Sequence, residues 1–238
     1  MGGAAMGGAV MDWATIYPTL VWFHVLLLVF WLGADLGVFI LGQHFRKRHI
    51  YSVSERLILL KLLVITDMGP RTAWALMVPS SLILLKLGGW WRGMPDWLLF
   101  AGFALGAAWL WLVWEAHTHD QTPRAARARA IENPLKFLLT GFYLTLGIVS
   151  LRNGAPLEGF LAWKALFFGC IFVAAILIDL AFKPVGPQLM RLISEGSSDE
   201  TEIPLRQTMD RTRIWVMLVY ALLLATSWLG VTKGSGLF

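Results

Sequence analysis

Residues 17–42 read YPTLVWFHVLLLVFWLGADLGVFILG, and this stretch decides the fold. His24 and Asp35 are its only imidazole and carboxylate side chains. A helix that crosses a bilayer needs about 20 mostly apolar residues, so the stretch is long enough to span. Because a backbone in lipid must satisfy its own hydrogen bonds, the stretch is predicted to be helical.

Similar apolar runs follow along the chain, at about 56–86, 97–117, 134–151, 158–182 and 213–232. Together with 17–42 they predict an all-α, polytopic transmembrane bundle of six spans. The run 56–86 is too long for one simple span and contains Pro70 and Pro79. It is therefore expected to begin as an interfacial or kinked helix.

The composition excludes a soluble protein. Of 238 residues, 57% are hydrophobic and 15% are charged, whereas soluble domains carry about 25% charged residues. Residues 1–238 are therefore interpreted as a single integral membrane domain. The net charge of +5 lies in short clusters between apolar runs, so it indicates topology and not nucleic-acid binding. Cys170 is the only cysteine, which excludes an intramolecular disulfide.

The basic residues orient the chain. The segments 43–56, 118–136 and 183–213 hold thirteen Lys and Arg residues, and the opposite side holds four. Basic loops stay in the cytoplasm, so both termini are expected on the non-cytoplasmic side, in a bacterial inner membrane. The cytoplasmic loop 183–212 is expected to contain a short interfacial helix and then an acidic, mobile linker.

Ionisable side chains inside apolar runs are costly, and function is the default hypothesis for them. Six stand out, and they are His24, Asp35, Asp67, Arg71, Lys164 and Asp179. At 100° per residue, His24, Trp31 and Asp35 fall within about 40° of one another on a helix. Asp67 and Arg71 are spaced i,i+4, which predicts an ion pair along one helix face.

An imidazole in a low-dielectric, aromatic bundle is one way in which a membrane haem is held, so His24 is a candidate haem ligand. The remaining histidines fall near the cytoplasmic edge and cannot easily share an iron with His24. Lys164 is the other candidate at this depth, as an axial ligand or as a partner of a haem propionate.

Residues 22–39, WFHVLLLVFWLGADLGVF, carry a pattern of His24, Trp31 and Gly33. This pattern resembles the first helix of a membrane superfamily that contains HemJ-type protoporphyrinogen oxidases, CopD copper-resistance proteins and the membrane part of PuuD-type urate oxidases. Residues 160–182, FLAWKALFFGCIFVAAILIDLAF, look like the HemJ helix that opens with Trp and Lys. The resemblance implies a haem-associated bundle, with His24 as the haem-linked histidine and Lys164 as the accompanying lysine.

The leading hypothesis is a haem b-binding redox protein that exchanges electrons with quinone or with a partner subunit. Trp31 would pack on the macrocycle, and Arg71 would serve a propionate. The enzyme class and the catalytic residues stay open, with a HemJ-like membrane oxidoreductase as the expectation for an enzyme.

Two alternatives remain. One is a proton- or metal-coupled transporter that uses Asp35, Asp67, Arg71 and Asp179. The other is a non-catalytic accessory subunit. Homo- or hetero-oligomers are expected to form through helix faces with two glycines four residues apart, Gly33/Gly37 or Gly102/Gly106.

Overall fold

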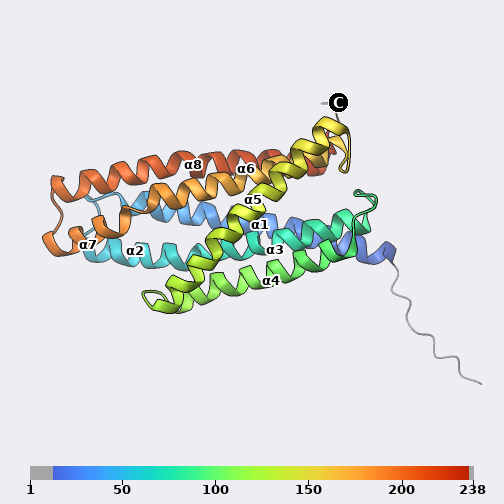
Figure 1. The fold of residues 1–238 in the computed structure, drawn as a ribbon. Coiled ribbons are helices and arrows are strands. Elements are labelled where there is room, and N and C mark those ends of the chain that lie inside the picture. The colour runs from blue at the N-terminus through green and yellow to red at the C-terminus, as the bar shows by residue number, and fades with distance from the viewer. Residues whose placement is uncertain (1–12, 236–238) are drawn as a thin grey trace, which may run out of the picture.

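The computed structural model describes residues 13–235, with side chains from residue 16 onward. This part of the chain is helical and contains no strand, which confirms the all-α prediction (Figure 1). The helices are α1 (Trp13–Phe45), α2 (Val53–Thr66), α3 (Met68–Leu87), α4 (Asp96–Thr118), α5 (Pro123–Asn153), α6 (Gly159–Phe182), α7 (Val185–Glu195) and α8 (Asp199–Thr232).

Five helical stretches among the described residues are long and apolar enough to cross a membrane. They begin at Ile16 in α1, Asp96 in α4, Pro123 in α5, Gly159 in α6 and Asp199 in α8. α3 is of sufficient length but is more polar. Eleven of its 20 residues are buried against other helices. Much of the α3 surface is therefore covered by protein, and α3 can be more polar than the other long helices.

The predicted discontinuity in the run 56–86 is present as a break between α2 and α3 at Asp67. Pro70 explains its position, because a proline ring clashes with the carbonyl group four residues earlier, and that residue is Thr66, the last of α2. Pro70 itself lies in the first turn of α3, where its missing N–H costs little.

The acidic segment that precedes the last span is helical and is not the linker that we expected. A short helix, α7, is present where one was predicted, but α8 already begins at Asp199. Ser198 and Thr201 form a capping box there, and three acidic residues lie in the first turn. Negative charge stabilises a helix N-terminus, so the acidic composition that suggested a linker instead starts a helix.

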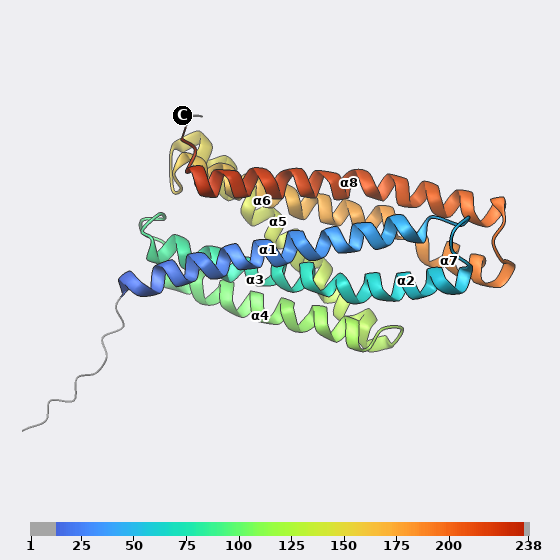
Figure 2. The same cartoon turned by 180° about the vertical axis from the view of Figure 1, so that it is seen from behind.

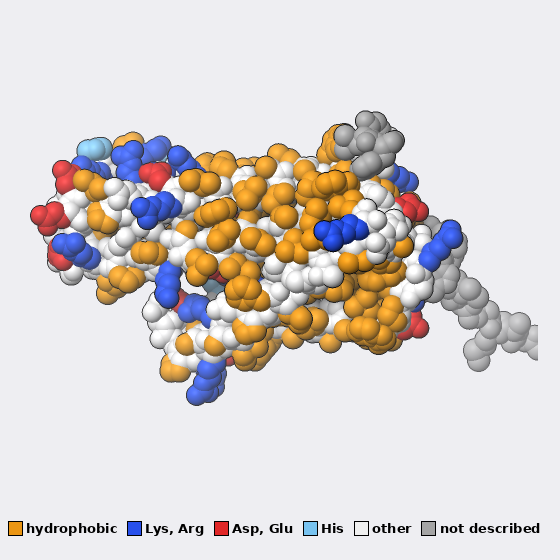
Figure 3. Space-filling view, turned by 45° about the horizontal axis from the view of Figure 1, so that its top comes forward, with side chains coloured by type: hydrophobic (Ala, Val, Ile, Leu, Met, Phe, Trp, Pro, Cys, Tyr) orange, Lys and Arg blue, Asp and Glu red, His pale blue; other side chains and the backbone are white. Residues whose placement is uncertain are grey.

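The bundle is held by neighbouring pairs of helices. α6 packs along α5 and α8, and α3 lies between α1 and α4. α1 and α8 converge towards the end where α2 and α7 lie, and they diverge towards the opposite end (Figure 2). The α1–α2, α4–α5 and α7–α8 connections point towards one end, whereas α1 begins and α8 ends at the other. Figure 3 shows hydrophobic side chains across the middle of one face and charged side chains gathered around α7.

The α4–α5 turn is fixed by polar contacts outside the apolar stretches. The Thr122 side chain accepts a hydrogen bond from the backbone N–H of Ala125 at the start of α5. Arg129 pairs with Asp120 at 2.6 Å. The hydrogen bond from Arg129 holds the pKa of Asp120 below its ordinary value.

Glycines allow the closest helix contacts. A Cβ at Gly147 would lie 2.6 Å from the backbone N of Leu166, and one at Gly169 would lie 2.9 Å from the backbone N of Leu144. α5 and α6 therefore touch backbone to backbone, a contact that the sequence analysis did not predict.

The two small-residue faces that we considered for oligomers differ in exposure. Gly102 and Gly106 are buried against Leu82 and Pro79 of α3, so this face is covered within the chain. On α1, Gly37 packs on Thr66 of α2, and a Cβ at Gly33 would meet nothing within 4 Å.

Candidate functional site

His24 lies on the inward side of α1 and is held by α3. Its Nδ1 lies 2.9 Å from Ser80 Oγ, and Ser80 Oγ donates its own hydrogen to the carbonyl oxygen of Met77 at 3.1 Å. In the tautomer in which Nδ1–H donates to Ser80, the neutral ring keeps a bare lone pair on Nε2, the arrangement of a metal-binding imidazole.

Lys164 of α6 lies near His24. The two side chains are close enough to interact electrostatically, although 140 positions separate them in the sequence. The Lys164 amine lies against α8, because a Cβ at Gly230 would be 2.8 Å from its Nζ. Within the described residues, we find no carboxylate that shares this environment. His24 and Lys164, which the resemblance singled out, thus contact α3 and α8 respectively.

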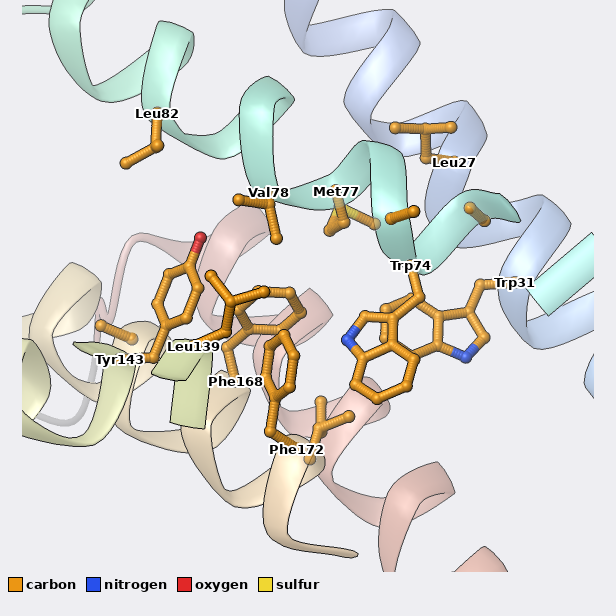
Figure 4. Packing of buried hydrophobic residues seen from close by; sticks show 14 of the residues in the cluster. Leu27, Trp31, Trp74, Met77, Val78, Leu82, Leu139, Tyr143, Phe168 and Phe172 are labelled. Atoms are coloured by element: carbon orange, nitrogen blue, oxygen red, sulfur yellow. The ribbon is translucent and has the colours of Figure 1, made fainter. Parts of the chain in front are cut away.

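Trp31 lies two turns along α1 from His24, in an aromatic core with Trp74, Tyr143, Phe168 and Phe172 (Figure 4). Trp109 belongs to the same core and packs against Trp74 and Phe172. Its ring centroid is 5.8 Å from that of Trp74 and 6.4 Å from that of Phe168. Only 4% of Trp31 is exposed. The indole Nε1 of Trp74 is buried and has no hydrogen-bond partner in the described part of the chain.

A second polar group lies on the far side of the aromatic core. We call it the ionic cluster, and it contains Asp35, Asp67, Arg71, Glu132, Lys136 and Asp179. On three helices, aromatic residues lie between the His24 region and the ionic cluster. They separate His24 from Asp35 on α1, Ser80 from Arg71 on α3, and Lys164 from Asp179 on α6.

The predicted Asp67–Arg71 ion pair is confirmed, with Arg71 Nε 2.5 Å from Asp67 Oδ2. Arg71 also interacts electrostatically with Glu132 and Asp179, and Asp35 interacts with both Asp67 and Arg71. Arg71 therefore lies with the carboxylates and not with His24. Ser80 lies nine positions after Arg71, which corresponds to about 13 Å along α3.

Lys136 connects two of the carboxylates. Its Nζ lies 3.1 Å from Glu132 Oε1 and 2.9 Å from Asp179 Oδ2. Glu132 also accepts a hydrogen bond from Trp109 Nε1 at 3.2 Å. The sequence analysis missed Glu132 and counted Lys136 among exposed loop residues, yet both are buried in α5. Their i,i+4 spacing was the signal that pointed to a pair.

Comparison of the chain with known protein families, with curated proteins and with solved structures finds no match.

Proposed function

We propose that this chain is a haem b-binding redox protein of a bacterial inner membrane. The observation that carries the proposal is the position of His24, which Ser80 holds on the inward side of α1. Lys164, whose amine lies against α8, is the second candidate ligand. The imidazole of His24 and the amine of Lys164 are the side chains that would hold the iron of a haem.

The residues around this pair fit such a group. Ser80 holds the ring of His24 so that Nε2 is free to bind a metal. Gly230 leaves room for the Lys164 amine, and the buried Trp74 Nε1 is a spare donor for an oxygen atom. When bound, a haem supplies one-electron redox chemistry.

The protein's own contribution is to orient the ligands and exclude water. The Ser80 hydrogen bond orients the ring of His24, as outer-shell partners of metal ligands do. Trp31 and Trp74 close the inner side of the region with packed rings. Arg71 pairs with Asp67 and is therefore not assigned to a propionate.

The proposal includes a topology of six crossings, with α3 as the sixth and the three basic connections in the cytoplasm. His24 and Lys164 then lie in the non-cytoplasmic half. A quinone or a neighbouring membrane subunit is the proposed electron partner. The exposed Gly33 face of α1 is open to such a subunit.

The test is an optical spectrum of protein that is produced with added haem precursor and purified in maltoside detergent. We expect a Soret band and a positive pyridine haemochrome assay, and we expect His24→Ala to lose both. Lys164→Met is expected to retain haem with a changed ligand-field spectrum. Ser80→Ala is expected to lower haem affinity about 10-fold or more, as outer-shell changes do.

His44→Ala is the matched control, because His44 is bonded to Tyr51 at 2.8 Å at the other end of α1. It should leave the spectrum unchanged. Well-folded protein without a Soret band, or a band that survives in His24→Ala, would contradict the proposal.

The ionic cluster favours a second candidate function, proton- or cation-coupled transport. Four carboxylates and two cationic groups from α1, the α2–α3 junction, α3, α5 and α6 meet there within the described residues. We expect a transporter to move protons or a cation into proteoliposomes and Asp35→Asn to abolish this flux. Asp96→Asn, an exposed change at the opposite end, is the control. Absence of flux for all tested cations would eliminate this candidate.

A further inference from the structure

A hollow of about 120 Å³ lies at the end of the molecule where α1 ends and α8 begins. We call it the arginine hollow, since its polar lining is Arg46, Arg48, His49, Arg56, Glu202 and Arg206. It is separated along α1 from His24 by more than 20 residues. Its volume is several times the 10–15 Å³ that a single water molecule requires.

Positive charge dominates the lining. Four guanidinium groups face one carboxylate, that of Glu202, among the described residues that form the hollow. Glu202 is already satisfied, because Arg56 binds both of its oxygens at 2.5 and 3.0 Å and Ser197 donates to one of them. The charges of the remaining arginines are therefore only partly balanced within the hollow.

The carboxylates outside the lining leave part of this charge unbalanced. Asp210 is shared, since it pairs with Arg46 and lies 4.0 Å from Arg206 and 3.7 Å from Arg213. Arg48 pairs with Asp199, whose side chain is 72% exposed. A single carboxylate cannot neutralise three guanidinium groups, so an anion would be stabilised here.

A buried donor without a partner points to the same ligand. Arg46 uses one terminal nitrogen for Gln43 and the other for Asp210. Its Nε is buried and has no hydrogen-bond partner in the described part of the chain. Leaving such a donor unsatisfied costs about 1–3 kcal/mol, and more for a charged group. Arg46 lines the hollow, and an oxyanion that reached its Nε would remove this cost.

The remaining lining is apolar and comes from α8, with Ile203, Leu205 and Met209. Ile203 is 50% exposed, so an apolar surface continues outward from the charged part of the hollow. A ligand with an oxyanion and an apolar substituent would match both parts.

We propose that the arginine hollow binds a phosphate group. Guanidinium forks match phosphate oxygens in bidentate geometry, and the free Nε of Arg46 supplies a donor that no protein group uses. The phosphate belongs either to an anionic phospholipid headgroup or to a free phosphate compound, and the chemistry of recognition is the same.

The experiment uses the full chain in maltoside detergent and phosphate-free buffer, in two arms. In the first, inorganic phosphate is added at constant ionic strength against chloride, and the midpoint of thermal unfolding is measured. In the second, phosphatidylglycerol is added and lipid adducts are counted by native mass spectrometry, with and without competing phosphate. Adducts that phosphate does not displace identify the lipid as the source.

We expect stabilisation or adducts in the intact protein, and at least a 10-fold loss of apparent affinity in Arg46→Gln, equivalent to 1.4 kcal/mol. Arg206→Gln, at a 74% exposed side chain, provides a second variant that folding should tolerate. It is expected to weaken binding too. Arg211→Gln changes the net charge equally outside the hollow and should bind normally. Absence of binding in both arms, or equal loss in all three variants, would overturn the proposal.

Discussion

Replacing Arg56 by Met is expected to lower the free energy of unfolding by about 3–5 kcal/mol, the cost of breaking a buried ion pair from one side. The Arg56 side chain is 1% exposed and that of Glu202 is 9% exposed. Arg56 also donates from Nε to the carbonyl oxygen of Phe45 at 2.6 Å. Removal of the guanidinium leaves a buried carboxylate and a backbone carbonyl without their donor.

The measurement is unfolding in maltoside titrated with dodecyl sulfate and followed by circular dichroism. Arg48→Met is the matched control, since the Arg48–Asp199 pair is exposed and should contribute less than about 1 kcal/mol. The double variant Arg56→Met/Glu202→Leu should recover much of the loss, because it leaves no unpaired charge. Equal effects of Arg56→Met and Arg48→Met would show that the buried pair is unimportant.

The second large effect is expected at Gly147, where a leucine should destabilise the bundle by about 3 kcal/mol, at the upper end for overpacking. The atoms that the new Cβ would meet belong to the backbone of α6, with Leu166 N at 2.6 Å and Leu166 Cα at 2.8 Å. Backbone atoms cannot rotate away as a side chain does, so α5 and α6 would have to separate.

Gly141→Leu on the same helix is the control, because a Cβ there meets nothing within 4 Å. Its effect should stay within about 0.5 kcal/mol, as for other surface changes. The same dodecyl sulfate titration measures both variants. A Gly141 variant as unstable as the Gly147 variant would refute the close-contact explanation.

Hydropathy predicted the helices that are long and apolar enough to cross a membrane, because it measures the property that lipid selects. It failed where a helix continues beyond its apolar stretch. Residues 199–212 are polar and yet continue α8, and Arg56 and Lys136, taken for loop residues, are buried in ion pairs. A window average cannot distinguish a charge that meets water from one that meets a carboxylate on another helix.

The candidate site was predicted residue by residue but not as an arrangement. Depth placed His24 and Lys164 in the same half of the bundle, and the resemblance linked them. The Ser80 partner of His24 was not foreseen, because a serine in an apolar helix carries no signal of the helix that it faces. The sequence likewise did not reveal that Arg71 interacts with four carboxylates, which are Asp35, Asp67, Glu132 and Asp179.

The polarity of α3 has a consequence for biogenesis. A helix that leaves the translocon alone must be apolar by itself, and an arginine near the centre of a span costs about 2.5–3.5 kcal/mol in that process. In the proposed topology, in which α3 is the sixth crossing, α3 carries Arg71, two prolines and two serines into the bilayer, where α1 and α4 cover it. Its integration is therefore expected to wait for α4, so that the first half of the protein enters the membrane as a group of helices.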